Sequence, residues 1–396
     1  MTAINTEVAI IGAGPSGSIA AHQLAAAGLD VVLLDRAKFP RDKPCGGGVT
    51  VRCERILPFS IDPVIEDVIT DADIRIRDES SVLQTSGSVL TYMTQRARLD
   101  AFLADKAQEV GTKFRDGEQV TDILSKAGDG FVVKTRSGTE IQARVLLGAD
   151  GANGITGNRL GFDSHSEGAV ALEGNVYFPD GVPSQFEHKV SLNFGYLTQG
   201  YGWIFPKGDH VNIGVGGSRL SGGKRLKAAM FKLAEIYGID YDSITEIKGH
   251  HLPMRRPGSA ISIDGSALLG DAAGLVDPLS GEGIFAALRS GMTVAPVVEQ
   301  YLSSEVDSLA GYQFELQKEL LPEIETSEAL MQIFHTYPRP FVWMLQHVGL
   351  FWIGAIELIR GDSTYLDLTN KFGKIGRSLL MPAAWLGDKI SARRRA

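Results

Sequence analysis

Three glycines near the N-terminus have the spacing of a site for nucleotide phosphates. Residues Val8 to Gly17 read VAIIGAGPSG, so an apolar strand leads directly into Gly12, Gly14 and Gly17, with Ser16 between the last two. In this G-x-G-x-x-G pattern the first glycine permits a tight turn and the second lets the backbone approach a pyrophosphate. The third lets the following helix pack closely on the strand. Free N–H groups at the start of that helix attract phosphates.

The segments that follow supply the rest of a βαβ unit. We expect a helix of small residues from Ser18 to Ala27, ended by Gly28, and a second apolar strand from Val31 to Leu34. Asp35 ends that strand, where its carboxylate can accept from ribose hydroxyls, and Arg36 comes next. The pattern predicts an α/β, Rossmann-like domain that binds a dinucleotide.

Composition narrows the function classes. The 396 residues are 44% hydrophobic and 22% charged, which allows two or three globular domains. A net charge of −8 gives nucleic-acid binding no electrostatic support. The two cysteines, Cys45 and Cys53, cannot form a disulfide framework, and no second cysteine pair exists for a zinc site. We therefore expect a cytoplasmic protein that binds neither nucleic acid nor metal.

The nucleotide-binding domain is predicted to be discontinuous, built from residues 1–60, 91–165 and 250–300. Residues 61–90 and 166–249 contain short alternating runs with turn residues between them, which predicts an antiparallel β-sheet substrate domain. Residues 301–396 have a helical pattern, beginning with a helix expected over Tyr301 to Leu321.

One segment, Phe341 to Ile359, is almost long enough to span a membrane. Gln346, His347 and Glu357 interrupt it, so a membrane span is disfavoured. Two interpretations stay open: a buried C-terminal helix, or a surface that touches lipid or admits a long apolar substrate. Peripheral contact with a membrane is therefore an alternative to a wholly cytoplasmic location.

Two later glycine motifs are expected to complete the cofactor site. Asp150 lies in a Gly-Ala-Asp-Gly sequence at one strand end, and Gly270 and Asp271 lie at another, where they are expected to open a helix. Further on, Gly283 and Ile284 begin a helix. The N-terminal end of a helix is partly positive, which suits the negative charge that develops on a flavin ring when it is reduced. Asp271 is positioned to hold cofactor hydroxyls.

Taken together, the chain resembles the geranylgeranyl reductase family, within the flavoprotein superfamily that includes para-hydroxybenzoate hydroxylase. The resemblance covers about residues 5 to 300 and rests on GAGPSG, KPCGGG, QRARLD, GADG, YGWIFPK and GDAAGLVDPLSGEGI. It implies bound FAD. Arg96 is included because it precedes Asp100 by the family's spacing. The residues that the resemblance assigns to FAD are Asp35, Cys45, Gly46, Gly48, Arg96, Val120, Asp271, Gly283 and Ile284.

Two groups of residues are candidates for the chemistry itself. Cys45 lies in a Pro-Cys-Gly-Gly-Gly turn, either beside the flavin ring or as a structural thiol. Tyr201, Trp203 and Phe205 alternate before Pro206, so they share one face of a strand and can line a wall for an apolar substrate. We take Cys45, Tyr201 and Trp203 as catalytic candidates and expect an apolar tunnel beside the flavin.

The resemblance implies a reductase that saturates the double bonds of a long apolar isoprenoid, a prenyl chain of the geranylgeranyl type, by hydride transfer from reduced FAD. No second nucleotide-binding unit is recognisable, so NAD(P)H, ferredoxin or another redox carrier protein stays open as electron donor.

The alternative to a prenyl reductase is a monooxygenase or halogenase of the same superfamily. A halogenase is disfavoured because no lysine occurs between Lys43 and Lys106. For a polar head group, Lys207, Arg255 and Arg256 are candidates, but the role expected of each is a solvated surface charge.

Overall fold

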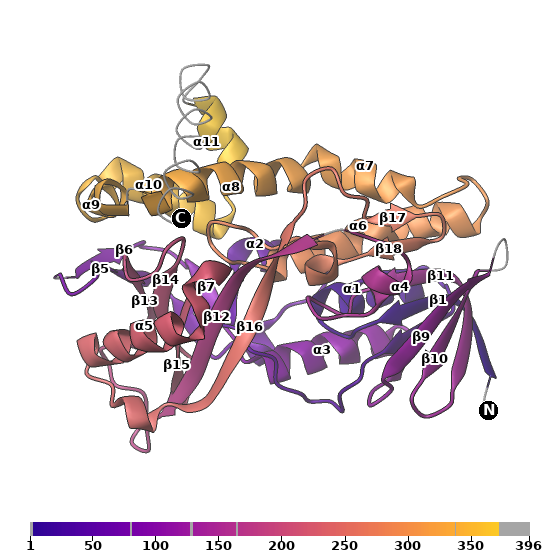
Figure 1. Ribbon diagram of the computed structural model, residues 1–396, viewed down its shortest axis with the longest axis horizontal. Coiled ribbons are helices and arrows are strands. Elements are labelled where there is room, and N and C mark those ends of the chain that lie inside the picture. The colour runs from indigo at the N-terminus through magenta and orange to yellow at the C-terminus, as the bar shows by residue number, and fades with distance from the viewer. Residues whose placement is uncertain (1–2, 80, 127–129, 164, 337, 372–396) are drawn as a thin grey trace.

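The structure, a computed structural model, describes residues 3–79, 81–126, 130–163, 165–336 and 338–371. It contains two large sheets side by side, with the C-terminal helices lying across one side of both (Figure 1). The part of the predicted helical segment beyond residue 371 lies outside the described residues.

The first sheet has eight strands and holds the βαβ unit. Five of its strands are parallel, in the order β18 (Ser266–Leu268), β11 (Glu140–Gly148), β1 (Ala3–Ile11), β2 (Val31–Leu34) and β8 (Lys113–Arg115). Three antiparallel strands extend it, namely β17 (Ser262–Ile263), β10 (Gly130–Thr135) and β9 (Val120–Lys126). Parallel strands buried on both faces read as continuous apolar runs, which is why Val31–Leu34 was recognisable from sequence.

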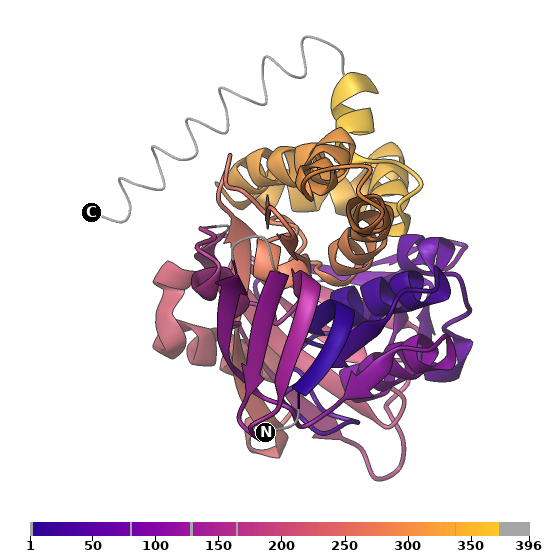
Figure 2. The same cartoon turned by 90° about the vertical axis from the view of Figure 1, so that its right-hand side faces the viewer.

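Helices cover one face of the parallel strands (Figure 2), and the other face packs against β9 and β10. The helix after the glycine turn, α1 (Pro15–Ala26), begins three residues earlier than expected because Pro15 suits the first helical position. It packs against α3 (Arg96–Glu109) and α6 (Ile284–Leu302). Gly291 of α6 permits the close approach, since a Cβ there would lie 2.4 Å from the Ser16 carbonyl oxygen.

The second sheet has seven strands in the order β16, β12, β15, β14, β13, β5, β6. Their bounds are β16 (Thr245–Arg255), β12 (His165–Tyr177), β15 (His210–Ser218), β14 (Tyr201–Pro206), β13 (Lys189–Phe194), β5 (Asp71–Ile76) and β6 (Val82–Thr85). It is antiparallel as expected except that β13 and β5 run parallel. Helix α5 (Gly222–Ile236) covers one face through Met230 and Leu233.

Smaller elements lie between the two sheets. A three-stranded sheet is formed by β3 (Gly48–Thr50), β7 (Thr91–Met93) and β4 (Asp67–Ile69). Two short helices, α2 (Val51–Ile56) and α4 (Thr156–Arg159), follow β3 and β11. The expectation that Gly270 opens an α-helix is wrong: residues Gly270–Ala273 form one 3₁₀ turn, and the α-helix begins only at Ile284.

The C-terminal region is helical but divided differently from the prediction. The helix expected over Tyr301 to Leu321 is interrupted after Leu302 and resumes in α7 (Ala310–Lys318). The remaining helices are α8 (Leu320–Thr336), α9 (Pro338–His347), α10 (Gly349–Arg360) and α11 (Tyr365–Lys371).

The apolar segment Phe341–Ile359 is not one buried helix. It is divided between α9 and α10, which meet at 99°, and within the described residues no single helix passes the length and hydropathy test for a membrane span, although this bent pair does so together. Trp343, Leu350 and Ile353 are 56%, 81% and 52% exposed. Part of the apolar surface of this pair therefore faces outward.

Candidate active site

The glycine turn leaves room for a ligand at the start of α1. Gly12 has φ +102°, and a Cβ there would lie 2.2 Å from the Ala149 carbonyl oxygen, so only glycine fits. Gly14 differs, because a Cβ there would meet only Arg96 Nη2, at 4.0 Å. No side chain caps α1 and no acid occupies its first turn, so its N–H groups point into this space. Ser16 is buried in the same turn.

A buried ion-pair network holds Arg96 beside that space. Its Nε and Nη2 donate to the two carboxylate oxygens of Asp100 at 2.8 and 2.7 Å, and Arg41 Nη1 donates to Asp100 at 2.7 Å. Burial alone would lower the pKa of Arg96, but Asp100 outweighs it and the pKa is raised. Burial alone would raise the pKa of Asp100, but the two guanidiniums keep it below its ordinary value. Both groups are therefore charged.

Asp35 anchors the glycine turn as well as ending β2. Its carboxylate accepts from the N–H groups of Ala13 and Ala37 at 3.0 and 2.9 Å. Arg36, by contrast, is exposed, and Val120 is buried at the start of β9. The structure thus places Asp35 at the glycine turn. It does not bring Arg36 or Val120 to that turn.

Asp150 has a structural task that the sequence did not indicate. One of its oxygens, Oδ2, accepts from the N–H groups of Ile155 and Thr156 and from the Thr156 hydroxyl, at 2.7 to 2.9 Å. Burial raises its pKa. The other oxygen, Oδ1, is buried and has no hydrogen-bond partner among the described residues, which suits an additional donor from a bound molecule.

Asp271 lies close to the start of α6. It pairs with Lys43 at 3.0 Å; burial alone would raise its pKa, but Lys43 outweighs this and the pKa is lowered. His250 of β16 lies nearby, and burial together with Lys43 lowers its pKa to about 4, so it is neutral at pH 7. A Cβ on Gly283 would lie 3.3 Å from Asp271 Oδ1, and no side chain caps α6 before Ile284.

The loop before α6 is fixed by residues that sequence reasoning missed. Asp277 accepts from the N–H groups of Leu279 and Ser280, and Glu282 pairs with Arg52. The Tyr201 hydroxyl donates to the Ser280 carbonyl at 2.6 Å, which ties this loop to the second sheet. The contacts of Glu282 with Arg52 and of Tyr201 with Ser280 join segments far apart in the chain, so no local spacing revealed them.

The Pro-Cys-Gly-Gly-Gly turn packs on β14. A Cβ on Gly46 would lie 3.0 Å from the Phe205 ring and 3.4 Å from Trp203 Nε1, so the flat groups closest to this glycine are side chains of the protein. Cys45 is partly exposed, and its sulfur accepts from the Gly47 N–H at 3.3 Å. Gly48 begins β3.

The aromatic row is present and longer than predicted. Ring centroids of Tyr201 and Trp203 are 5.9 Å apart, and those of Trp203 and Phe205 are 6.2 Å apart. Pro206 ends the strand, buried. From Tyr201 the contacts continue at 5.2 to 6.4 Å into the C-terminal helices, through Phe194, Phe334, Phe341 and Phe351. The row thus connects the Cys45 turn with α10.

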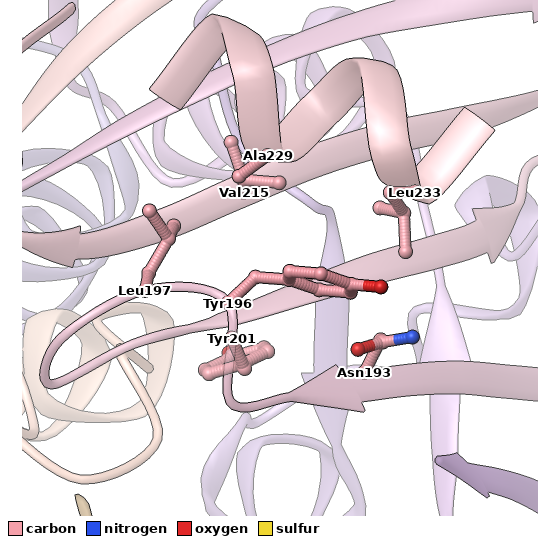
Figure 3. Close-up of a pocket in the computed structure, with 8 residues that line it drawn as sticks. Asn193, Tyr196, Leu197, Tyr201, Val215, Ala229 and Leu233 are labelled. Carbon is pink, nitrogen blue, oxygen red and sulfur yellow. The ribbon is translucent and has the colours of Figure 1, made fainter. Parts of the chain in front are cut away.

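The spaces found beside the row differ from the expected apolar tunnel. A void of about 10 Å³, the size of one water molecule, lies between Tyr201 and α5 (Figure 3). A polar cavity of about 190 Å³ lies between residues 42–45, the start of α3 and the second sheet. The packed aromatic rings therefore have to move for a prenyl chain to pass among them.

The expected surface role of Lys207 is wrong. Its side chain is buried and its Nζ donates to the Cys45 carbonyl at 3.1 Å, because it continues the buried face of β14. Arg256 is half-exposed and pairs with Asp163, and Arg255 donates to the Ser259 carbonyl.

Comparison with known proteins agrees with this geometry. A family model described as an FAD binding domain matches residues 5–210. Menaquinone reductase of Mycobacterium tuberculosis is 32% identical over 315 residues, spanning 74% of this chain and 77% of its own. Chloroplastic geranylgeranyl diphosphate reductase of Oryza sativa is 28% identical over 352 residues, spanning 83% and 75%. The chain belongs to the geranylgeranyl reductase family of FAD-dependent oxidoreductases.

Solved structures agree in fold. A geranylgeranyl bacteriochlorophyll reductase-like protein of Thermoplasma acidophilum superposes with a TM-score of 0.77 at 20% identity, covering 93% of this chain and 99% of that one. A flavin-dependent brominase gives 0.72 at 19% identity, covering 90% and 94%. As a member of the reductase family the protein is an FAD enzyme, and its residues fit that cofactor: the space at Gly14, the uncapped starts of α1 and α6, and the orphan oxygen of Asp150 all suit it.

Proposed function

We propose that the protein saturates carbon–carbon double bonds in the prenyl chain of a membrane-soluble molecule. Bound FAD, when reduced, would supply a hydride to one alkene carbon, and a proton that comes ultimately from solvent would be added to the other. The observation that carries the proposal is the aromatic row from Phe205 to Phe351, since a continuous row of aromatic side chains suits contact with an apolar chain.

For the cofactor, we propose that N–H groups at the start of α1, with Arg96, hold the pyrophosphate. Asp35 would hold a ribose, and the start of α6 at Gly283 and Ile284 would face the flavin ring. This assignment is supported by the space at Gly14 and by the absence of a side-chain cap on either helix.

The aromatic side chains present ring faces because their polar atoms are already used. The Tyr201 hydroxyl donates to Ser280, and Trp203 Nε1 donates to Asn212 at 2.8 Å. Burial raises the pKa of Tyr201, so its hydroxyl stays protonated and neutral. We therefore assign Tyr201 and Trp203 to holding and orienting the chain beside Cys45, in water-poor surroundings.

A lipid-soluble substrate explains the outer surface of α9 and α10. Trp343, Leu350 and Ile353 are exposed there, and Phe351 of α10 is the far end of the aromatic row. We propose that this surface contacts a membrane peripherally, so that the chain passes from lipid to the row.

Among prenyl substrates, we favour a neutral quinone over a diphosphate. The relative at 32% identity is named a menaquinone reductase. Two of the three cations considered for a charged head group already have partners within the chain: Lys207 donates to the Cys45 carbonyl, and Arg256 pairs with Asp163.

The test is an anaerobic half-reaction. Purified holoprotein is reduced with dithionite and mixed with menaquinone in detergent, or separately with geranylgeranyl diphosphate, while flavin absorbance and product mass are followed. The product is reoxidised in air before its mass is read, because reduction of the quinone ring to the quinol also adds two mass units. Flavin reoxidation with a gain of two mass units per double bond that remains after this step supports the proposal. Trp203→Leu should slow reoxidation, whereas Tyr177→Leu, a half-exposed aromatic of the same sheet, should not.

The alternative function is an oxygenase or halogenase, suggested by the fold it shares with the brominase. Reoxidation that waits for oxygen and yields an oxygenated or halogenated product would establish it and refute prenyl reduction.

A further inference from the structure

Two charged side chains from the second sheet hold the backbone of Cys45. Glu173 Oε1 accepts from the Cys45 N–H at 2.7 Å, and Lys207 Nζ donates to the Cys45 carbonyl at 3.1 Å. The N–H and the carbonyl lie on either side of one Cα, so the two hydrogen bonds together restrain both backbone dihedrals of Cys45. They therefore fix the direction of its Cα–Cβ bond, from which the thiol extends.

Lys207 is packed against the turn rather than merely near it. It follows Trp203 and Phe205 at the same two-residue spacing, and its side chain is 4% exposed. Gly47 has φ +74°, and a Cβ there would lie 2.4 Å from Lys207 Nζ. The strand face that carries the aromatic row thus ends in an ammonium group seated on the glycine turn.

The polar contacts extend from this turn to the row itself. Asn212 accepts from Trp203 Nε1 at 2.8 Å, and its Nδ2 donates to Asn175 Oδ1 at 3.0 Å, two residues beyond Glu173 on β12. Glu173, Asn212, Lys207 and Cys45 line the same polar cavity, so the turn and the aromatic row share this polar surface.

Burying the charged groups of Glu173 and Lys207 lowers the stability of the folded protein. Burial lowers the pKa of Lys207 and raises the pKa of Glu173, which shows that both charged forms lose solvation. Apolar side chains of similar size would generally be as stable or more stable at buried ionic positions. A role in stability therefore does not account for the pair, and a role in geometry does.

We infer that Glu173 and Lys207 are positioning residues that clamp the Cys45 turn onto the second sheet and so fix the turn where the FAD-binding half meets the aromatic row. The inference goes beyond prenyl reduction, because it concerns the position of the turn and holds whichever alkene is reduced.

The experiment follows Cys45 directly and needs no substrate. Iodoacetamide labelling, read by intact mass, reports on Cys45 because Cys53 is fully buried and its pKa is raised to about 12. The flavin reduction potential of the holoprotein is the second readout. Glu173→Leu and Lys207→Met remove the hydrogen bonds, whereas Glu173→Gln keeps an acceptor oxygen and Lys207→Arg keeps a donor.

We expect Glu173→Leu and Lys207→Met to speed Cys45 labelling about tenfold or more, because each loses a hydrogen bond to a charged group. Both should also shift the flavin potential, and Glu173→Gln and Lys207→Arg should restore both readouts to within about twofold of the wild type. Because each single apolar variant leaves the other buried charge without its partner, both are expected to lose stability, and far-UV circular dichroism verifies that they still fold. The double variant Glu173→Leu with Lys207→Met removes both charges, and it should show the same faster labelling without the stranded charge.

Two results would overturn the inference. One is wild-type labelling in both apolar variants, which would show that the turn holds its position without them. The other is a Glu173→Gln variant as impaired as Glu173→Leu, which would show that the negative charge matters and not the hydrogen bond. Neither result bears on whether a prenyl chain is reduced, so failure of the clamp and failure of the proposed function are separable.

Discussion

Removing Asp100 alone should lower the free energy of unfolding more than removing both Asp100 and Arg96. Asp100 is completely buried, and it accepts two hydrogen bonds from Arg96 and one from Arg41, all at 2.7 to 2.8 Å. Asp100→Leu leaves the Arg96 guanidinium, 5% exposed, without its partner. Breaking a buried pair in this way typically costs about 3–5 kcal/mol of unfolding free energy.

The matched control is the double variant Arg96→Met with Asp100→Leu. It removes the stranded charge as well, and apolar replacement of a whole buried pair is generally neutral or stabilising. Arg41 keeps some exposure and can turn toward solvent. The double variant should therefore recover most of the loss, although it should bind FAD weakly if Arg96 contacts the pyrophosphate.

The assay is urea unfolding of the FAD-free protein, followed by circular dichroism, with midpoint and slope compared between variants. The reasoning would be refuted if Asp100→Leu lowered the free energy of unfolding by less than about 1 kcal/mol. It would also be refuted if the double variant were no more stable than the single one, because an unpaired buried charge is known to be destabilising. The pH dependence adds a check. Because the pKa of Asp100 is lower folded than unfolded, its stabilisation is complete above the ordinary value of 3.8 and is lost as pH falls through the folded value.

Four further outcomes can be measured. Gly14→Ala should leave the apoprotein stable, since a Cβ has room there, but should weaken FAD binding by about tenfold or more in titration calorimetry, because it fills the phosphate space. Gly12→Ala should instead fail to give soluble protein, because its Cβ meets backbone at 2.2 Å. Iodoacetamide at pH 8 should add one group, at Cys45, because burial raises the pKa of Cys53 to about 12; a second adduct in folded protein would contradict this. Leu350→Glu, at an 81% exposed position, should reduce cosedimentation with lipid vesicles without lowering the thermal midpoint.

The βαβ unit could be predicted from sequence because its signals are local. Strand, glycine turn, helix and Asp35 all fall within the first 35 residues, and each element has its own chemical reason. The aromatic row of β14 was equally visible, because alternation places Tyr201, Trp203 and Phe205 on one face.

The remaining contacts depend on tertiary packing that no spacing reveals. Lys207 belonged to the same alternation, but a lysine after Pro206 reads as surface until the Cys45 turn is seen packed on it. Glu173 and His250 come from strands with no local motif and reach the site only because β12 and β16 pair with each other. The break between α9 and α10 was hidden because the residues on both sides of Gly349 are apolar.

The order of the strands also bears on how the protein is made. The sheet that carries the glycine turn takes β1 from the start of the chain and β18 from residues 266–268, and α1 is covered by α6. A ribosome must therefore release the chain through Leu302 before this half can close around α1. FAD is then acquired late in synthesis, and the nascent N-terminal segment, with its buried-type strands Val8–Ile11 and Val31–Leu34, is a natural client for chaperones until that point.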